Sequence, residues 1–180
     1  MASLKHEIAQ ELPFFSVEEE ALLNVMRTAD AMHRAFHRKT RGWGVTSTQY
    51  NVLRILRGAH PNGLTCSAIG ERMITAEPDI TRLLARLKTL KFVRQQRDKH
   101  DRRVVWTHIS ESGLALLKEM DPVIQRAPIE LLGHLSEAEL REFIRLLELA
   151  RRQSEDSLEP VSCTGEGCSE SEAATETARA

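Results

Sequence analysis

The densest concentration of chemically active side chains is a basic run between Arg82 and Arg103. It contains nine Lys or Arg residues and only two acids, Asp98 and Asp101. The planar guanidinium group of arginine can donate paired hydrogen bonds to phosphate oxygens or to the edge of a guanine. The run therefore predicts a surface that contacts nucleic acid. A solvated helix face followed by a protective charged hairpin is the alternative that these residues leave open.

The net charge of the whole chain, −1, hides this local excess. Residues 154–180 hold seven acids and one base, a sum of −6, which leaves 24 bases and 19 acids, a sum of +5, in residues 1–153. A charged partner responds to this local distribution, so the total does not argue against nucleic acid. Residues 154–180 are also rich in Ser, Glu, Thr, Ala and Gly, and we expect them to form a disordered acidic tail.

Three Ser or Thr residues, each followed three positions later by Glu or Gln, predict helix starts of the capping-box type. The pairs are Ser16–Glu19, Thr46–Gln49 and Ser136–Glu139. Apolar residues at helical spacing extend the first helix over residues 17–39 and the second through about Gly58. The third pair opens the last helix, whose apolar stripe includes Leu140 and Leu147.

Two short helices joined by a turn are expected between these elements. Thr65 can cap a helix that runs through Met73, and Thr75 can cap the next, where Pro78 is tolerated because first-turn amides lack helical partners. An apolar stripe on that second helix faces inward and consists of Ile80, Leu83, Leu84 and Leu87. The outward face carries Thr75, Pro78, Arg82 and Arg86. This arrangement is a helix-turn-helix.

A β-hairpin, or wing, is predicted directly after the helix-turn-helix. Residues 92–97 and 103–109 are rich in Val, Phe, Trp, Thr and Ile, and they flank the polar turn DKHD. Ser110 then begins another helix, which Pro122 and Pro128 bend or interrupt. The predicted fold class is mainly α with a small β-hairpin wing, a winged helix-turn-helix.

Helix and wing together predict two kinds of DNA contact. Thr75, Pro78 and Arg82 lie near the start of the second helix and are candidates to face bases in the major groove, while Arg86 extends the same basic face. The basic side chains of the wing would reach a narrow minor groove, where negative potential attracts arginine: Arg97, Lys99, His100, Arg102 and Arg103. Because both elements carry charge, we favour DNA binding over a merely solvated surface.

The segment AEPDITRLLARLKTLKFVRQQRDKHDRRVVWTHISESG resembles the recognition helix, wing and following helix start of the MarR family of winged-helix regulators. The matching residues are Thr81-Arg82-Leu83, Arg86-Leu87, Phe92-Val93, Asp101-Arg102-Arg103 and Ser110-x-x-Gly113. Upstream, Thr46-x-x-Gln49-Tyr50-x-x-Leu53 resembles the opening of the family's second helix. The resemblance covers about residues 16–152.

This resemblance implies a homodimer whose subunits pair through dimerisation helices, here about 17–39 and 111–153. It places a winged helix-turn-helix over about residues 46–109, inside a MarR-like domain of residues 16–153 that follows an N-terminal arm, 1–15. Such a dimer would bind a palindromic operator in double-stranded DNA. The function that the resemblance implies is a sequence-specific transcriptional repressor that a small molecule releases.

The resemblance also bears on four positions of the wing and the recognition helix. It implies that Asp101 pairs with Arg103 and orients that arginine at the wing, although the pair can equally be only an internal brace. Lys91 stands where the family usually has Gly at the end of the recognition helix, which implies a strained or altered turn. Ala85 replaces a common acid and makes the outward face more basic.

A small aromatic effector is a further partner that the resemblance implies, near the loop between the first two helices. Trp43 and Tyr50 flank this loop, and His33 and His37 lie one helical turn apart before it. The aromatic residues can instead only staple the loop, and the two His are also spaced to bind zinc. No Cys, His or Glu set completes such a site, so no metal or other cofactor is predicted.

Three cysteines do not make a disulfide framework. We expect Cys66 to be a small buried residue of the short third helix. Cys163 and Cys168 are expected to be incidental thiols, with a local disulfide or a bound thiophilic metal as alternatives. A metal- or redox-responsive regulator, and a winged helix that binds protein rather than DNA, are the alternative functions.

Other function classes find little support in the sequence. There is no Gly-rich phosphate loop and no persuasive nucleophile–base pair, so no enzymatic activity is predicted. No apolar run approaches the roughly 18 residues that a membrane-spanning helix needs, and the N-terminus lacks the apolar core of a secretory signal. We therefore expect no membrane partner and a cytoplasmic location.

Overall fold

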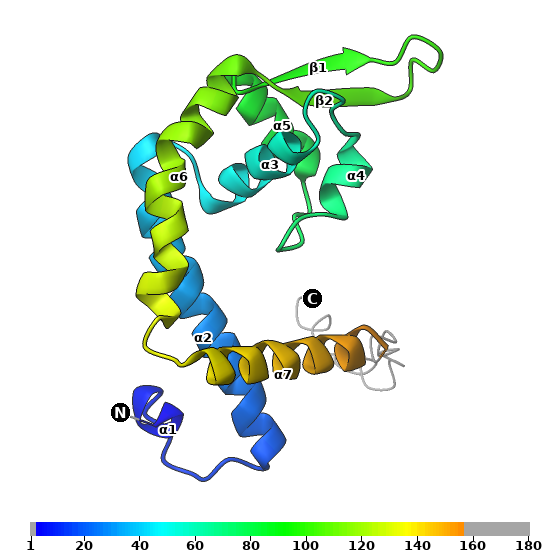
Figure 1. Ribbon diagram of the computed structural model, residues 1–180. Coiled ribbons are helices and arrows are strands. Elements are labelled where there is room, and N and C mark those ends of the chain that lie inside the picture. Colours follow the sequence, from blue (N-terminus) through cyan, green and yellow to red (C-terminus); the bar gives the residue numbers. More distant parts are fainter. Residues whose placement is uncertain (1–2, 157–180) are drawn as a thin grey trace, which may run out of the picture. The chain divides into compact units, whose positions relative to one another are not determined.

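The computed structural model describes residues 3–156, which are mainly helical with one antiparallel hairpin (Figure 1). The helices are α1 (Leu4–Glu7), α2 (Val17–Thr40), α3 (Ser47–Gly58), α4 (Cys66–Gly70), α5 (Ile80–Thr89), α6 (Glu111–Leu132) and α7 (Glu137–Asp156), with a 3-10 turn η1 (Arg41–Trp43). The strands β1 (Val93–Arg97) and β2 (Val105–Ile109) lie between α5 and α6. The predicted fold class is confirmed. Nearly all of the predicted tail, with Cys163 and Cys168, lies outside the described residues.

The chain divides into two compact units, Met1–His134 and Leu135–Ala180. Helix α7 belongs to the second unit, and its start has the predicted capping box. The Ser136 amide donates to the Glu139 carboxylate at 2.8 Å, and the Glu139 amide donates to the Ser136 hydroxyl at 3.4 Å. Ile144 on this helix is 53% exposed.

The core of the first unit lies where α3, α4, α5 and α6 meet the hairpin (Figure 1). Helices α2 and α6 run alongside each other in the same unit. The largest fully buried apolar side chains come from all four core helices: Leu53, Leu56, Ile69, Leu84, Leu87, Leu117 and Met120. Because each of these helices contributes residues to one core, α5 and the hairpin are held in fixed positions by the same packed side chains.

Capping side chains place the first helices. Thr46 and Gln49 form the predicted capping box of α3, with N–O distances of 3.1 and 2.9 Å. The Ser16 hydroxyl caps α2, but the Glu19 carboxylate accepts from the Phe15 amide instead of the predicted Ser16 amide. The Glu19 side chain therefore reaches back one residue further than in a standard capping box.

Two predictions about the core helices are corrected. Helix α4 ends at Gly70 instead of Met73. Pro122 and Pro128 were expected to bend or interrupt α6, and the interruption is excluded because the helix runs from Glu111 to Leu132 through both prolines. Met120, Ile124 and Ala127 are buried on the same helix, and we infer that this packing offsets the hydrogen bonds that the prolines cannot make. Within residues 3–156, no helix combines the length and apolarity that crossing a bilayer requires.

The hairpin is joined to the chain before α4 by an extra backbone bridge. Leu64 and Thr107 exchange two N–H···O hydrogen bonds of 2.8 and 2.9 Å. Gly63 has φ +72°, and a Cβ atom there would lie 2.7 Å from the Thr107 carbonyl oxygen. Only glycine permits this close, left-handed approach, which keeps α4 against the wing.

Candidate DNA-binding surface

The recognition helix α5 starts later than the sequence suggested. Asp79 is its N-cap, and the carboxylate accepts from the Arg82 amide at 2.8 Å. The predicted Thr75 cap is wrong, because Thr75 and Pro78 lie in the exposed turn that precedes the helix. A residue before proline avoids the α conformation, so Pro78 keeps Glu77 outside the helix and leaves the cap to Asp79. Thr75 and Pro78 thus remain near the helix start without belonging to it.

Helix α5 has the two faces that its periodicity predicted. Leu84 and Leu87 are 2% and 0% exposed, and Ile80 and Leu83 pack half-buried against the same core. Arg82 and Arg86 are both exposed on the other side. Since the guanidinium groups point away from the core, they are available to a partner. Their contact with DNA stays a prediction.

The end of α5 has the altered turn that was expected at Lys91. This residue has φ +64°, the left-handed conformation that favours glycine. Its amide donates to the Lys88 carbonyl at 2.9 Å, and the Phe92 amide donates to the Leu87 carbonyl at 3.0 Å. The helix therefore ends in a tight left-handed turn that leads straight into β1.

Asp98 organises the tip of the wing. Its carboxylate accepts from the His100 amide at 2.7 Å, the Asp101 amide at 3.1 Å and the Trp106 indole Nε1 at 3.0 Å. These hydrogen bonds lower the pKa of the Asp98 carboxyl, and the bond from the Asp101 amide has the largest effect. Sequence reasoning missed this role, although an Asp whose carboxylate can reach amides two and three residues later is a known turn signal.

The expected brace between Asp101 and Arg103 takes a different form. The Asp101 carboxylate accepts from the Arg103 backbone amide at 2.9 Å, and within residues 3–156 the two side chains form no ion pair. The carboxylate is aimed into the turn, where a backbone amide is nearer than the guanidinium. Asp101 therefore fixes the backbone at Arg103 and leaves the guanidinium available.

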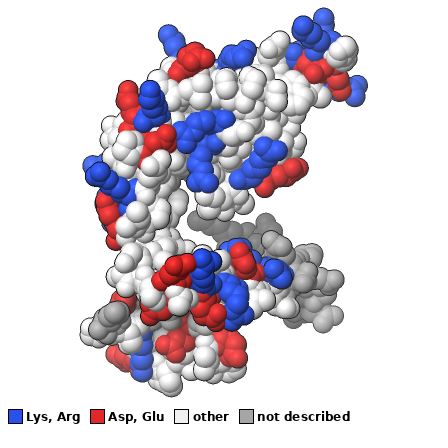
Figure 2. Space-filling view, viewed as in Figure 1, with Lys and Arg blue, Asp and Glu red and all other residues white. Residues whose placement is uncertain are grey.

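The basic side chains of the wing are exposed to solvent. Figure 2 shows Lys and Arg gathered with a few acids at the far end of the hairpin of Figure 1. The predicted wing contacts are all exposed: Arg97, Lys99, His100, Arg102 and Arg103. The hairpin thus presents a cationic tip on the same unit as the exposed arginines of α5.

An ion pair ties the helix-turn-helix to α6. The Arg57 guanidinium on α3 donates to both carboxylate oxygens of Asp121 on α6, at 3.0 and 2.8 Å. Both side chains are about one-third exposed, so the pair is only partly screened by solvent. It fixes α3, and with it the recognition helix, to the long helix α6.

The four residues predicted to line an effector site differ in how exposed they are to solvent. Tyr50 is 4% exposed and its ring centroid lies 5.7 Å from that of Phe36, while Trp43 is half-buried. Burial raises the pKa of the Tyr50 hydroxyl. His33 and His37 are exposed on α2. The described part of the chain contains no group of three possible metal ligands.

Cys66 differs from its prediction. The thiol is exposed rather than buried, because Cys66 is the first residue of α4 and faces a pocket between that helix start, α5 and the hairpin. Apolar packing at this position is supplied by Ile69 instead, which is fully buried.

Comparisons with known proteins agree with this geometry. Residues 43–104 match a family model described as MarR family. The chain is 39% identical to a MarR transcription factor from Planctomyces limnophilus, over 76% of this chain and 99% of that protein, with a TM-score of 0.59. This chain belongs to the MarR family.

Two other relatives extend the comparison of this MarR-family chain. The HTH-type transcriptional regulator TtmR from Methylorubrum extorquens is 31% identical over 106 residues, which are 59% of this chain and 53% of TtmR. The chain thus spans about half the length of that relative. MepR from S. aureus, solved in complex with DNA, has 21% identity and a TM-score of 0.67 over 78% of this chain and 99% of MepR. The latter likeness shows the winged helix-turn-helix fold.

Proposed function

We propose that this MarR-family transcriptional regulator binds a specific palindromic operator as a homodimer. The observation that carries the proposal is the orientation of α5: Leu84 and Leu87 are buried, while Arg82 and Arg86 are exposed. The start of α5, with Thr75 and Pro78 just before it, enters the major groove. Because the cationic wing tip follows α5 directly, it reaches the neighbouring minor groove.

Self-association is supported by apolar side chains that a single chain leaves uncovered. On α2, Leu22 and Met26 are each 60% exposed and Val25 is 45% exposed. Phe15, just before α2, is 95% exposed. Large apolar side chains grouped on one helix are typical of a protein interface. A second copy of the chain would cover them and, by its symmetry, require an operator with half-sites roughly 34 Å apart.

A fluorescence anisotropy titration tests the DNA proposal. Bound fragments selected from the source genome supply the operator, and affinity is measured over a range of salt concentrations. We expect Arg82→Ala to cost about 1–3 kcal/mol on the operator, and Arg103→Ala to reduce the salt slope by about 1. Lys118→Ala is the matched control, because it removes an exposed cation from α6. Equal affinities and slopes in all three variants would contradict the proposal.

We further propose that a small aromatic effector bound near Trp43 and Tyr50 releases the operator, and that the protein acts in the cytoplasm as a repressor without a catalytic step. The Phe36–Tyr50 ring pair, in which Tyr50 is buried and Phe36 is half-buried, and the half-buried Trp43 of the same loop region support an aromatic ligand here. Salicylate is a suitable probe. Its titration should change Trp fluorescence in the wild type and not in Trp43→Phe, which retains Trp106, and should weaken operator binding.

A further inference from the structure

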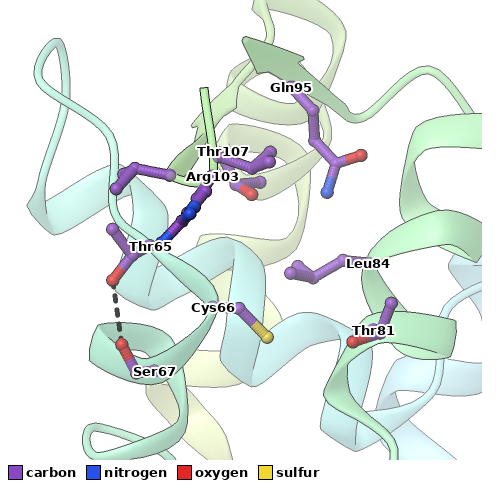
Figure 3. A pocket seen from close by; sticks show the side chains of 10 residues that line it. Thr65, Cys66, Ser67, Thr81, Leu84, Gln95, Arg103 and Thr107 are labelled. Carbon is purple, nitrogen blue, oxygen red and sulfur yellow. Dashed lines mark hydrogen bonds between the residues drawn. The ribbon is translucent and has the colours of Figure 1, made fainter. Parts of the chain in front are cut away.

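A pocket of about 630 Å³ lies between the start of α4, helix α5 and the hairpin. Figure 3 shows Cys66 and Leu84 on one side of this space and Arg103 and Thr107 on the other. Val104 and Val105 complete an apolar wall. The volume falls in the range of small-ligand sites in proteins.

Two side chains that line this pocket have a polar or reactive group that takes no part in holding the described fold together. The Thr107 side chain is 1% exposed, and its hydroxyl is buried without a hydrogen-bond partner in the described structure. Such a buried, unpaired hydroxyl costs free energy, which an acceptor on a bound molecule would recover. The second group is the exposed Cys66 thiol, a nucleophile at the edge of the same pocket. The Thr107 hydroxyl can therefore donate a hydrogen bond to an acceptor on a ligand, and the Cys66 sulfur can form a covalent bond with that ligand.

The other residues that line the pocket limit the kinds of ligand that it can bind. Arg103 offers only hydrogen-bond donors, and none of the described residues that line this pocket carries a carboxylate. A ligand that matches these walls has a small apolar body, which packs against Leu84 and the valines, and a carbonyl oxygen, which accepts from Thr107 or Arg103. If the carbon two bonds from that carbonyl is electrophilic, the thiol can also react with it.

We propose that Cys66 is a covalent modification site for small α,β-unsaturated carbonyl compounds, and that the adduct weakens DNA binding. The thiol gives its proton to water, and the thiolate electron pair forms a carbon–sulfur bond at the β-carbon. The electron pair of the carbon–carbon double bond moves to give an enolate, whose oxygen the Thr107 hydroxyl and the Arg103 guanidinium can stabilise. The α-carbon then takes a proton from water. No group leaves, and no oxidant or reductant takes part.

The link to DNA rests on the proposed function. Arg103 is a wall of the pocket and also a proposed minor-groove contact, so an adduct carbonyl competes with phosphate for its guanidinium. Leu84 is part of α5, so an adduct that fills the pocket presses between the recognition helix and the wing. Both effects disturb the surface that must fit two adjacent grooves.

The test uses the full chain with Cys163→Ser and Cys168→Ser, which leaves Cys66 as its single thiol. The probe is methyl vinyl ketone, and intact mass spectrometry measures the adduct. We expect one adduct per chain and an operator affinity about tenfold lower after modification, as for the loss of one charge-assisted hydrogen bond. The same protein with Cys66→Ser should form no adduct and keep its affinity.

A second measurement separates a pocket from a merely exposed thiol. Thr107→Val removes the hydroxyl at nearly constant volume, and methyl methanethiosulfonate reacts with thiols without presenting a carbonyl. We expect Thr107→Val to slow enone addition about fivefold, the value of one hydrogen bond, and to leave the methanethiosulfonate rate unchanged. Unchanged methanethiosulfonate reactivity also shows that the variant keeps its fold around Cys66.

Three results would overturn the proposal: no adduct on Cys66, equal enone rates with and without the Thr107 hydroxyl, or an adduct that leaves operator affinity unchanged. If instead the unmodified protein binds no DNA, the proposed function fails, while the adduct and its rates still decide whether the site exists.

Discussion

The hydroxyl of Ser110 donates a hydrogen bond of 2.7 Å to the backbone carbonyl of Lys91. It also accepts from the Gly113 amide at 3.1 Å, so one side chain caps α6 and holds the end of α5. The Ser112 hydroxyl donates to the same Lys91 carbonyl at 2.7 Å, and the Ser110 amide donates to the Phe92 carbonyl at 3.0 Å. The Ser-x-x-Gly motif is therefore a clasp between the recognition helix and α6.

The first prediction concerns the backbone strain inside this clasp. Lys91 has φ +64°, and a non-glycine residue in this region costs roughly 1–2 kcal/mol. Lys91→Gly should therefore raise the free energy of unfolding by about 1 kcal/mol relative to Lys91→Ala. Both variants lose the same charge, so the difference reports the backbone alone. Urea unfolding followed by circular dichroism measures it, and equal stabilities would show that the turn carries no such strain.

The second prediction concerns the glycine of the clasp. A Cβ atom on Gly113 would lie 2.4 Å from the Phe92 carbonyl oxygen, a backbone atom that cannot rotate away. Gly113→Ala should destabilise the fold by about 1–3 kcal/mol, as overpacking does. Gly58→Ala is the control, because a Cβ there meets nothing within 4 Å and helix propensity favours Ala by up to about 1 kcal/mol. The opposite signs of the two changes in melting temperature are the result to check.

Local patterns predicted much of this fold because local physics decides it. Thr46 and Gln49 cap α3 through bonds that span three residues, so spacing alone identified the helix start. The apolar stripe of α5 likewise predicted which side of the helix, Leu84 and Leu87, is buried. These features depend on neighbours in the sequence, which the sequence itself displays.

Other features depend on competition between local signals or on distant neighbours. Thr75 and Asp79 are both good N-caps, and Pro78 decides between them by excluding Glu77 from the helix. The exposure of Cys66 depends on where the hairpin stands relative to α4, through the bridge of Leu64 to β2. The spacing of residues in the sequence does not show how close the hairpin lies to α4.

The wing brace shows how a resemblance can name a residue and miss its partner. Asp101 does stabilise the wing at Arg103, but its carboxylate binds a backbone amide. Asp98, which the resemblance did not single out, makes more bonds, because its side chain faces both the turn and the indole of Trp106.

The third prediction follows from the lowered pKa of Asp98. A carboxyl whose pKa is lower when folded stabilises the fold while it is ionised, and this stability is lost as the pH falls below its ordinary value of 3.8. Asp98→Asn should therefore reduce stability and change Trp106 fluorescence at pH 7. The difference between the variant and the wild type should shrink as the pH falls through and below that value. A difference that is independent of pH would exclude the carboxylate as the source.

The fourth prediction tests what covers α2. Leu22 is 60% exposed in the single chain, so a charge there costs little in a monomer and much in an apolar dimer interface. Leu22→Glu should shift the protein from dimer to monomer in sedimentation experiments and weaken operator binding, because two half-sites no longer bind as one unit. Ala31→Glu is the matched control: Ala31 is exposed on the same helix and, at about 100° per residue, lies on the opposite side from Leu22. It should leave the dimer intact. If both variants remain dimers with full affinity, the exposed stripe of α2 is not the surface through which the subunits pair, and the operator geometry must rest on another interface.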